Sequence, residues 1–129
     1  MDILFLIGRI LFGGYFIMNG LNHLFKGSAL AGYASSKGVS QPKLAVFATG
    51  LLILFGGIGI LLGVYVEYAV LFLALFLIPV SFMMHAFWKI SDPMAKMMDQ
   101  INFMKNMALL GAALMTLAIP MPWLWSVSF

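Results

Sequence analysis

The chain has 129 residues and a formal net charge of +3; 64% of its residues are hydrophobic and only 9% are charged. An ordinary soluble domain carries about a quarter charged residues, so this composition excludes a soluble fold and leaves no length for a separate catalytic domain. Cys is absent, which excludes disulfide exchange and ligation of metals or iron–sulfur clusters by thiolates. Any redox role therefore needs a bound cofactor.

Four apolar stretches are long enough to cross a bilayer, because about 20 helical residues span its hydrocarbon core. They cover residues 3–23, 44–64, 65–88 and 101–119. We therefore predict an all-α fold, an integral membrane bundle of four transmembrane helices. The bundle accounts for the whole sequence, so residues 1–129 are expected to form a single domain.

The segments between these stretches differ in character. Residues 26–43 are rich in Gly and Ser and are expected to form a short helix on the membrane surface. Residues 63–67 allow only a tight turn, which makes the second and third helices antiparallel neighbours. Residues 89–100 mix charges with Met and are expected to lie on the membrane surface. Trp123 and Trp125 resemble interfacial anchors at the opposite end.

The basic residues predict the orientation in the membrane. Arg9 alone lies near one end, whereas the other basic residues lie in or beside the two long connections. Because basic residues favour the cytoplasmic side, we expect a multi-pass protein of a prokaryotic plasma membrane with both termini outside. No basic stripe with interleaved aromatic residues indicates a nucleic-acid partner. The basic residues in or beside the two long connections, at the end expected to be the inner one, are Lys26, Lys37, Lys43, Lys89, Lys96 and Lys105.

Two charges lie near the outer end of the predicted bundle. Arg9 is about two turns into the first helix, and Glu67 begins the third. A charge within a membrane helix is costly unless it is paired, and the two residues lie at similar depth. We therefore predict a structural ion pair between Arg9 and Glu67.

Polar residues gather near the inner end, at helical spacings that place them on one face of each of three helices. Such a group of amides, imidazoles and an ammonium, with aromatic neighbours, is typical of a pocket for a polar headgroup. The alternative is that these side chains only form hydrogen bonds between helices. No metal site is predicted. The candidate ligand-binding residues are Asn19, Asn22 and His23, then His85 and Trp88, then Asn102, Lys105 and Asn106.

Several segments in order along the chain resemble the DoxX family of small four-helix membrane proteins. They include residues 16–23, 32–39, 56–59, 85–88 and 100–106. The resemblance implies an association with quinone-linked membrane oxidoreductases, including a thiosulfate:quinone oxidoreductase subunit. One departure concerns the second helix, where the family often has a Glu before the paired glycines and this chain has Ile53 and Leu54. A proton role for that Glu is not expected here.

Together these observations predict a small membrane subunit that binds a quinone at the inner end and is at most one subunit of an oxidoreductase. His23 or His85 would donate to a quinone carbonyl, the amides would orient the ring, and Lys105 would stabilise negative charge. A partner must supply electrons, so a larger membrane complex or a homo-oligomer is expected. The alternatives are a structural or assembly subunit without turnover, and a haem b protein with His23 and His85 as axial ligands.

Overall fold

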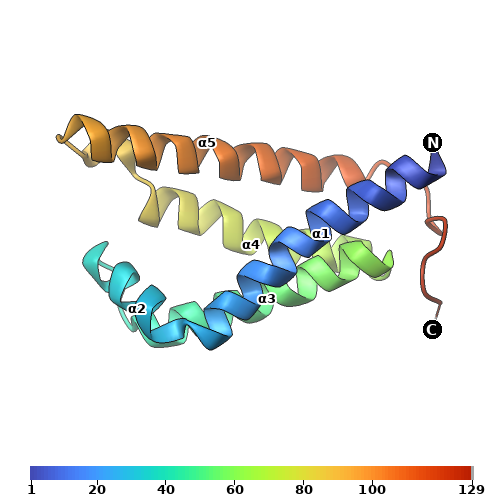
Figure 1. Ribbon diagram of the computed structural model, residues 1–129, viewed down its shortest axis with the longest axis horizontal. Coiled ribbons are helices and arrows are strands. Elements are labelled where there is room, and N and C mark those ends of the chain that lie inside the picture. The colour runs from blue at the N-terminus through green and yellow to red at the C-terminus, as the bar shows by residue number, and fades with distance from the viewer. Residues whose placement is uncertain (129) are drawn as a thin grey trace.

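The computed structural model describes residues 1–128, and all regular structure in that range is helical. Four long helices run side by side, and a short helix lies at the end away from both termini (Figure 1). This arrangement confirms the predicted all-α bundle. The helices are α1 (Asp2–Phe25), α2 (Gly27–Ser36), α3 (Pro42–Leu62), α4 (Val66–Met84), the 3-10 turn η1 (Phe87–Lys89) and α5 (Pro93–Thr116).

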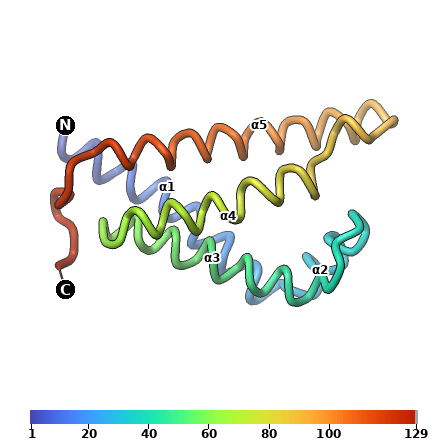
Figure 2. The backbone as a smooth tube through the Cα atoms, turned by 180° about the vertical axis from the view of Figure 1, so that it is seen from behind, coloured from blue at the N-terminus to red at the C-terminus, as the bar shows by residue number. Residues whose placement is uncertain are grey.

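Three segments are long and apolar enough to cross a membrane. They are Asp2–Phe25, Pro42–Leu62 and Val66–Lys89. The chain is therefore an integral membrane protein. The remaining long helix, α5, is less apolar because its first half carries charged side chains, but it runs antiparallel to α4 along the same length (Figure 2).

The helix α5 begins at Pro93 rather than near residue 101, so most of the second connection is helical. Two residues explain why α5 begins at Pro93. The Asp92 carboxylate accepts a hydrogen bond of 2.9 Å from the Ala95 backbone N–H, and Pro93 occupies the first turn, where its missing N–H costs nothing. A helix, α2, also occupies part of the first connection.

The backbones of α1 and α3 touch where two glycines face each other. A Cβ atom on Gly13 would lie 2.8 Å from the Gly57 carbonyl oxygen, and one on Gly57 would lie 2.7 Å from that of Gly13. Neither position has room for a side chain. Small residues of this kind allow close helix packing in membranes, where burial of apolar surface drives association weakly.

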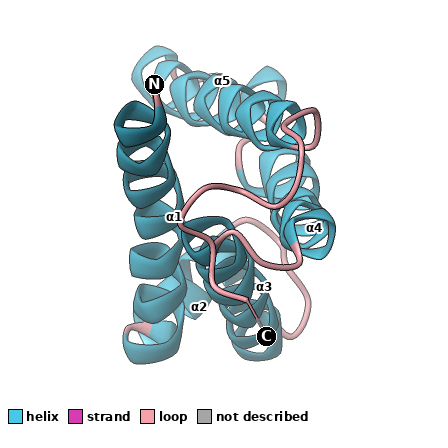
Figure 3. Cartoon of the chain, turned by 90° about the vertical axis from the view of Figure 1, so that its right-hand side faces the viewer, coloured by secondary structure: helices cyan, strands magenta, loops and turns pink. Residues whose placement is uncertain are grey.

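The order of the helices around the bundle follows the chain (Figure 3). Helix α3 packs against both α1 and α4, while α5 packs against α4. The buried residues of α5 are seven residues apart, so one narrow seam of that helix faces the bundle. They are Asp99, Asn106 and Ala113.

Candidate functional site

At the end of the bundle that holds the N-terminus (Figure 1), for which we keep the name outer end as a label only, Arg9 is buried and its guanidinium binds backbone carbonyls. Its Nη2 and Nη1 donate to the oxygens of Leu61 and Leu124 at 2.7 Å and 2.6 Å, and Nε donates to Ile60 at 3.4 Å. Glu67 is exposed to the surroundings of the bundle. The predicted ion pair between Arg9 and Glu67 is wrong, because within residues 1–128 the guanidinium is occupied by these carbonyls.

The end of α3 explains this arrangement. The last four carbonyls of a helix have no partner within it. Here the Gly59 oxygen accepts from the N–H groups of the following turn, Arg9 takes the next two, and the Leu62 oxygen accepts from Val127 N at 3.0 Å. Arg9 thus supplies the N–H donors that these terminal carbonyl oxygens need.

An aromatic residue closes the same end. Trp123 is 3% exposed and packs edge-on against Phe5, with ring centroids 5.1 Å apart. The Arg9 guanidinium carbon lies 5.6 Å from the centre of the Trp123 ring. Trp123 is therefore part of the buried core at this end, and not the interfacial anchor that the sequence suggested. Trp125 is exposed.

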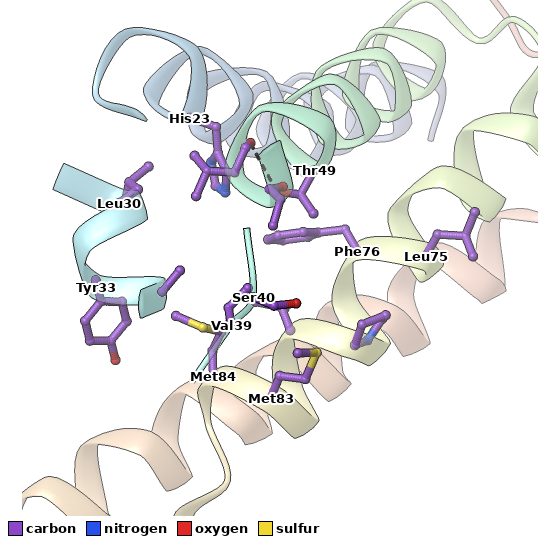
Figure 4. A pocket seen from close by; sticks show the side chains of 15 residues that line it. His23, Leu30, Tyr33, Val39, Ser40, Thr49, Leu75, Phe76, Met83 and Met84 are labelled. Atoms are coloured by element: carbon purple, nitrogen blue, oxygen red, sulfur yellow. Dashed lines mark hydrogen bonds between the residues drawn. The ribbon is translucent and has the colours of Figure 1, made fainter. Parts of the chain in front are cut away.

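The inner end contains a cavity of about 330 Å³ between α2, α3 and α4 (Figure 4). Its wall consists largely of aliphatic, aromatic and Met side chains. Four side chains with polar atoms also face it: His23 from the end of α1, Tyr33 from α2, Ser40 from the α2–α3 connection and Thr49 from α3. The cavity is thus apolar with a small number of polar groups, as small-molecule sites usually are.

His23 is held in one orientation in the cavity wall. Its Nδ1 donates to the Asn19 carbonyl oxygen at 2.8 Å, which leaves Nε2 as the ring nitrogen available for another partner. The ring also packs edge-on against Phe76 of α4, with centroids 5.7 Å apart. Gly50 of α3 makes room for it, since a Cβ atom there would lie 2.6 Å from the Cβ of His23.

Thr49 lies beside His23 on the same wall (Figure 4). Its hydroxyl donates to the Ala45 carbonyl oxygen at 2.6 Å, within its own helix. The hydroxyl proton is therefore engaged, and the oxygen can only accept from a molecule in the cavity.

Of the eight predicted ligand-binding residues, only His23 lines this cavity. Asn19 turns back along α1, where its Nδ2 donates to the Tyr15 carbonyl oxygen at 2.8 Å, and Asn22 is exposed. The expected convergence of the three helix faces on one cavity is not found. Helical spacing correctly places residues on one face, but it does not specify which neighbour that face meets.

The predicted residues of α5 lie away from the cavity. Asn106 is buried on the α5 seam and Asn102 is half-buried. Lys105 is exposed, with its ammonium 5.9 Å from the centre of the Tyr15 ring on α1. Helix α5 packs on α4, whereas the cavity opens between α2, α3 and α4.

Trp88 belongs to an aromatic cluster at the junction of α4, η1 and α5. Its ring centroid lies 5.7 Å from that of Phe103 and 5.9 Å from that of Phe82. Phe87 completes the cluster, 5.2 Å from Trp88. The cluster joins α4 to α5 and does not line the cavity.

A polar cluster that the sequence reasoning missed connects three elements beside the cavity. Asp99 of α5 accepts a hydrogen bond from the Lys37 ammonium at 2.6 Å and one from His85 Nδ1 at 3.1 Å. Lys37 follows α2 and His85 follows α4. Asp99 is only 5% exposed, so a carboxylate is buried between two donors.

Two opposing effects act on Asp99. Burial raises the pKa of its carboxyl group, but the hydrogen bonds and charges of Lys37 and His85 outweigh burial and leave the pKa below its ordinary value. The hydrogen bond to Asp99 raises the pKa of Lys37 more than burial lowers it. The three residues therefore form a charged clamp from α2 to α5. The i, i+3, i+7 spacing of Asp99, Asn102 and Asn106 is the signal that would have placed Asp99 on the inward face.

A bis-His haem does not fit this arrangement. His23 lines the cavity, whereas His85 does not and has its Nδ1 bound to Asp99. The two imidazoles thus share no cavity in which a porphyrin could lie between them. Within residues 1–128, no group of three or more His, Asp and Glu side chains is placed to hold a metal ion.

A family model described as DoxX matches residues 4–86, which run from α1 through the end of α4. No curated protein and no solved structure matches the chain. The matched range includes the walls of the cavity and His85, whereas Asp99 and the rest of α5 lie beyond it.

Proposed function

The chain belongs to the DoxX family of membrane proteins, and from this premise we propose that it binds the ring of a quinone in the cavity beneath α2. In this role the protein is a small subunit of a quinone-linked membrane complex. The basic residues support an orientation with the two long connections in the cytoplasm and both termini outside.

The observation that carries the proposal is the free Nε2 of His23 in an otherwise apolar wall. The volume of about 330 Å³ lies within the range of small-molecule sites. A quinone combines a flat apolar ring with carbonyl oxygens at opposite edges. Phe76 and the Met side chains of the wall supply the apolar surface, and His23 supplies one directional hydrogen bond.

The polar atoms of the cavity suit both redox states of such a ring. His23 would hold a proton at Nε2 against a carbonyl oxygen when its imidazole is protonated, or accept from a ring hydroxyl when it is neutral. Thr49 accepts from a hydroxyl as well. A bound quinone would supply the two-electron chemistry, and the electrons must come from another subunit because protein side chains do not carry them.

Binding of decylubiquinone to the purified protein in detergent tests the proposal. His23→Ala should weaken binding about tenfold, the usual effect of losing one hydrogen bond of about 1.4 kcal/mol. Asn22→Ala is the matched control, because Asn22 is the preceding residue, is exposed and does not line the cavity. Equal losses in both variants, or no binding to the unmodified protein, would reject the quinone site.

A second pair of variants tests the position of the site without removing a hydrogen bond. Ala45 lines the cavity, whereas Ala48, less than one turn further along α3, is exposed. Ala45→Phe should fill the space and abolish binding, and Ala48→Phe should leave it unchanged. Retained binding in the folded Ala45→Phe protein would show that quinone binds elsewhere. A protein that binds no quinone in any form would leave the structural or assembly subunit as its role.

A further inference from the structure

A second hollow lies at the inner end, where α1 meets α2. It is a groove of about 540 Å³ formed by the last turn of α1, the first turn of α2 and the start of α3. We call it the Lys26/Lys43 groove after the two lysines that line it. His23 and Val46 line both this groove and the cavity proposed for the quinone, and the other lining residues of the two differ.

The polar part of the groove is positive and has no counter-charge. Lys26 comes from the α1–α2 junction and Lys43 from the first turn of α3, and Ser28 adds a hydroxyl. No Asp or Glu lines the groove. Within residues 1–128 the ion pairs are those of Asp99, so neither of these lysines is neutralised. An anion in the groove would therefore be attracted by both ammonium groups.

The rest of the groove is apolar, and the charge and the apolar surface are separated by depth. Helix α3 runs from this end into the membrane, so Phe47 lies one turn deeper than Lys43 on the same face. Phe47 is 53% exposed, and Phe25 beside Lys26 is 82% exposed. Large aromatic side chains are thus available to a molecule whose charged part sits at the lysines.

We propose that the Lys26/Lys43 groove binds an anionic phospholipid. Its phosphate group lies between the two ammonium groups, and an acyl chain runs along Phe47 into the bilayer. Basic hollows between transmembrane helices at the inner surface are suited to such headgroups. A free phosphate has the same charge but no chain, so the exposed aromatic surface favours the lipid.

Native mass spectrometry of the whole chain from mixed micelles tests this assignment. The micelles contain dioleoyl phosphatidylglycerol and dioleoyl phosphatidylcholine in equal amounts, and the readout is the ratio of the two lipids retained. The unmodified protein should retain the anionic lipid in preference. Lys26→Gln and Lys43→Gln should each reduce that preference about fivefold, the change expected when one lysine near the surface is lost. Both lysines are exposed, so the variants are expected to fold.

The matched control is the single variant Lys96→Gln, which removes the same one charge at the same end but outside the groove. It should keep the preference of the unmodified protein. An equal loss in the control would mean that only net charge matters and would overturn the groove as a site. Absence of any preference in the unmodified protein would also overturn it. Binding of millimolar inorganic phosphate without a preference for phosphatidylglycerol would identify free phosphate as the occupant and overturn the lipid assignment.

Discussion

The two ends of the bundle differ in how far their polar groups are paired. At the outer end, the Arg9 guanidinium and the terminal carbonyls of α3 satisfy one another, and Trp123 covers them. At the inner end, the polar groups around the cavity are only partly used, because His23 is bound through one ring nitrogen and keeps the other free. Polar groups that are buried and paired stabilise the fold, whereas a polar atom left free in a cavity can bind another molecule.

In the part of the chain that the structure describes, the inner end itself holds two kinds of lysine, one paired and one unpaired. Lys37 is paired with buried Asp99, whereas Lys26 and Lys43 face an open groove. The clamp of Lys37, Asp99 and His85 is structural in this sense and resembles the outer end. The difference between stabilising and binding polar groups can be tested residue by residue.

The largest effect is expected for Arg9→Ala. This change removes several hydrogen bonds from a charged donor and leaves the carbonyls of Ile60 and Leu61 without partners. The free energy of unfolding in detergent should fall by about 3 kcal/mol or more. Glu67→Ala is the control and should have little effect, because Glu67 is exposed. Similar losses in both variants would restore the ion pair between them.

A smaller loss is expected for Asp99→Asn. The substitution keeps the shape of the side chain but removes the charge that holds Lys37 and His85. Stability in detergent should fall by about 2 kcal/mol. In a double-mutant cycle with Lys37→Gln, the two losses should not add, because each change breaks the same pair. Additive losses would mean that the clamp does not couple α2 to α5.

The same pair predicts the dependence of stability on pH. Because the pKa of Asp99 lies below its ordinary value of about 4, its contribution is present above that value and is lost as the pH falls through the lowered pKa. Because the pKa of Lys37 is raised above about 10.4, its contribution is present below that value and is lost as the pH rises through the raised pKa. The contributions therefore change below about pH 4 and above about pH 10.4, and unfolding midpoints measured in those two ranges should vary less in Asp99→Asn. An unchanged profile in that variant would contradict the assignment.

The smallest effect on the protein is expected for single cysteine substitutions, which report the topology of the chain in the membrane. Both termini lie at one end of the bundle, and α2 lies at the other (Figure 1). Cysteines introduced at the exposed positions Ser36 and Ser128 should react with an impermeant reagent from opposite sides of the membrane. Asp2→Cys should label from the same side as Ser128→Cys. Labelling of the Ser36 and Ser128 variants from one side would contradict a bundle in which α5 also crosses the membrane.

The sequence predicted the helices well because apolar length is a direct consequence of bilayer thickness. It located the start of α5 poorly for the same reason. Hydropathy marks the part of a helix inside the membrane, whereas α5 extends beyond its apolar stretch to the Asp92–Pro93 start. The Asp92–Pro93 capping pattern is visible in the sequence and predicts a helix that begins at Pro93.

The partners of the polar residues could not be predicted in the same way. Arg9 binds backbone oxygens, and every residue carries one, so no side-chain pattern points to them. Asp99 binds Lys37, which is 62 residues away in a connection. His23 lines the cavity, but much of the cavity wall comes from α2 and α3, which the helical spacing of polar residues did not indicate.

The hydrogen bonds of Arg9 have a consequence for biosynthesis. One of its acceptors, Leu124, lies 115 residues later in the chain, and the others lie at the end of α3. Until the ribosome has produced the end of α3, the guanidinium has none of these partners and must stay near the lipid headgroups or in water, about two turns from the start of α1. The third bond, to Leu124, forms only when the segment around Trp123 has been made, so a nascent chain that ends before it holds the Arg9 guanidinium by the α3 carbonyls alone.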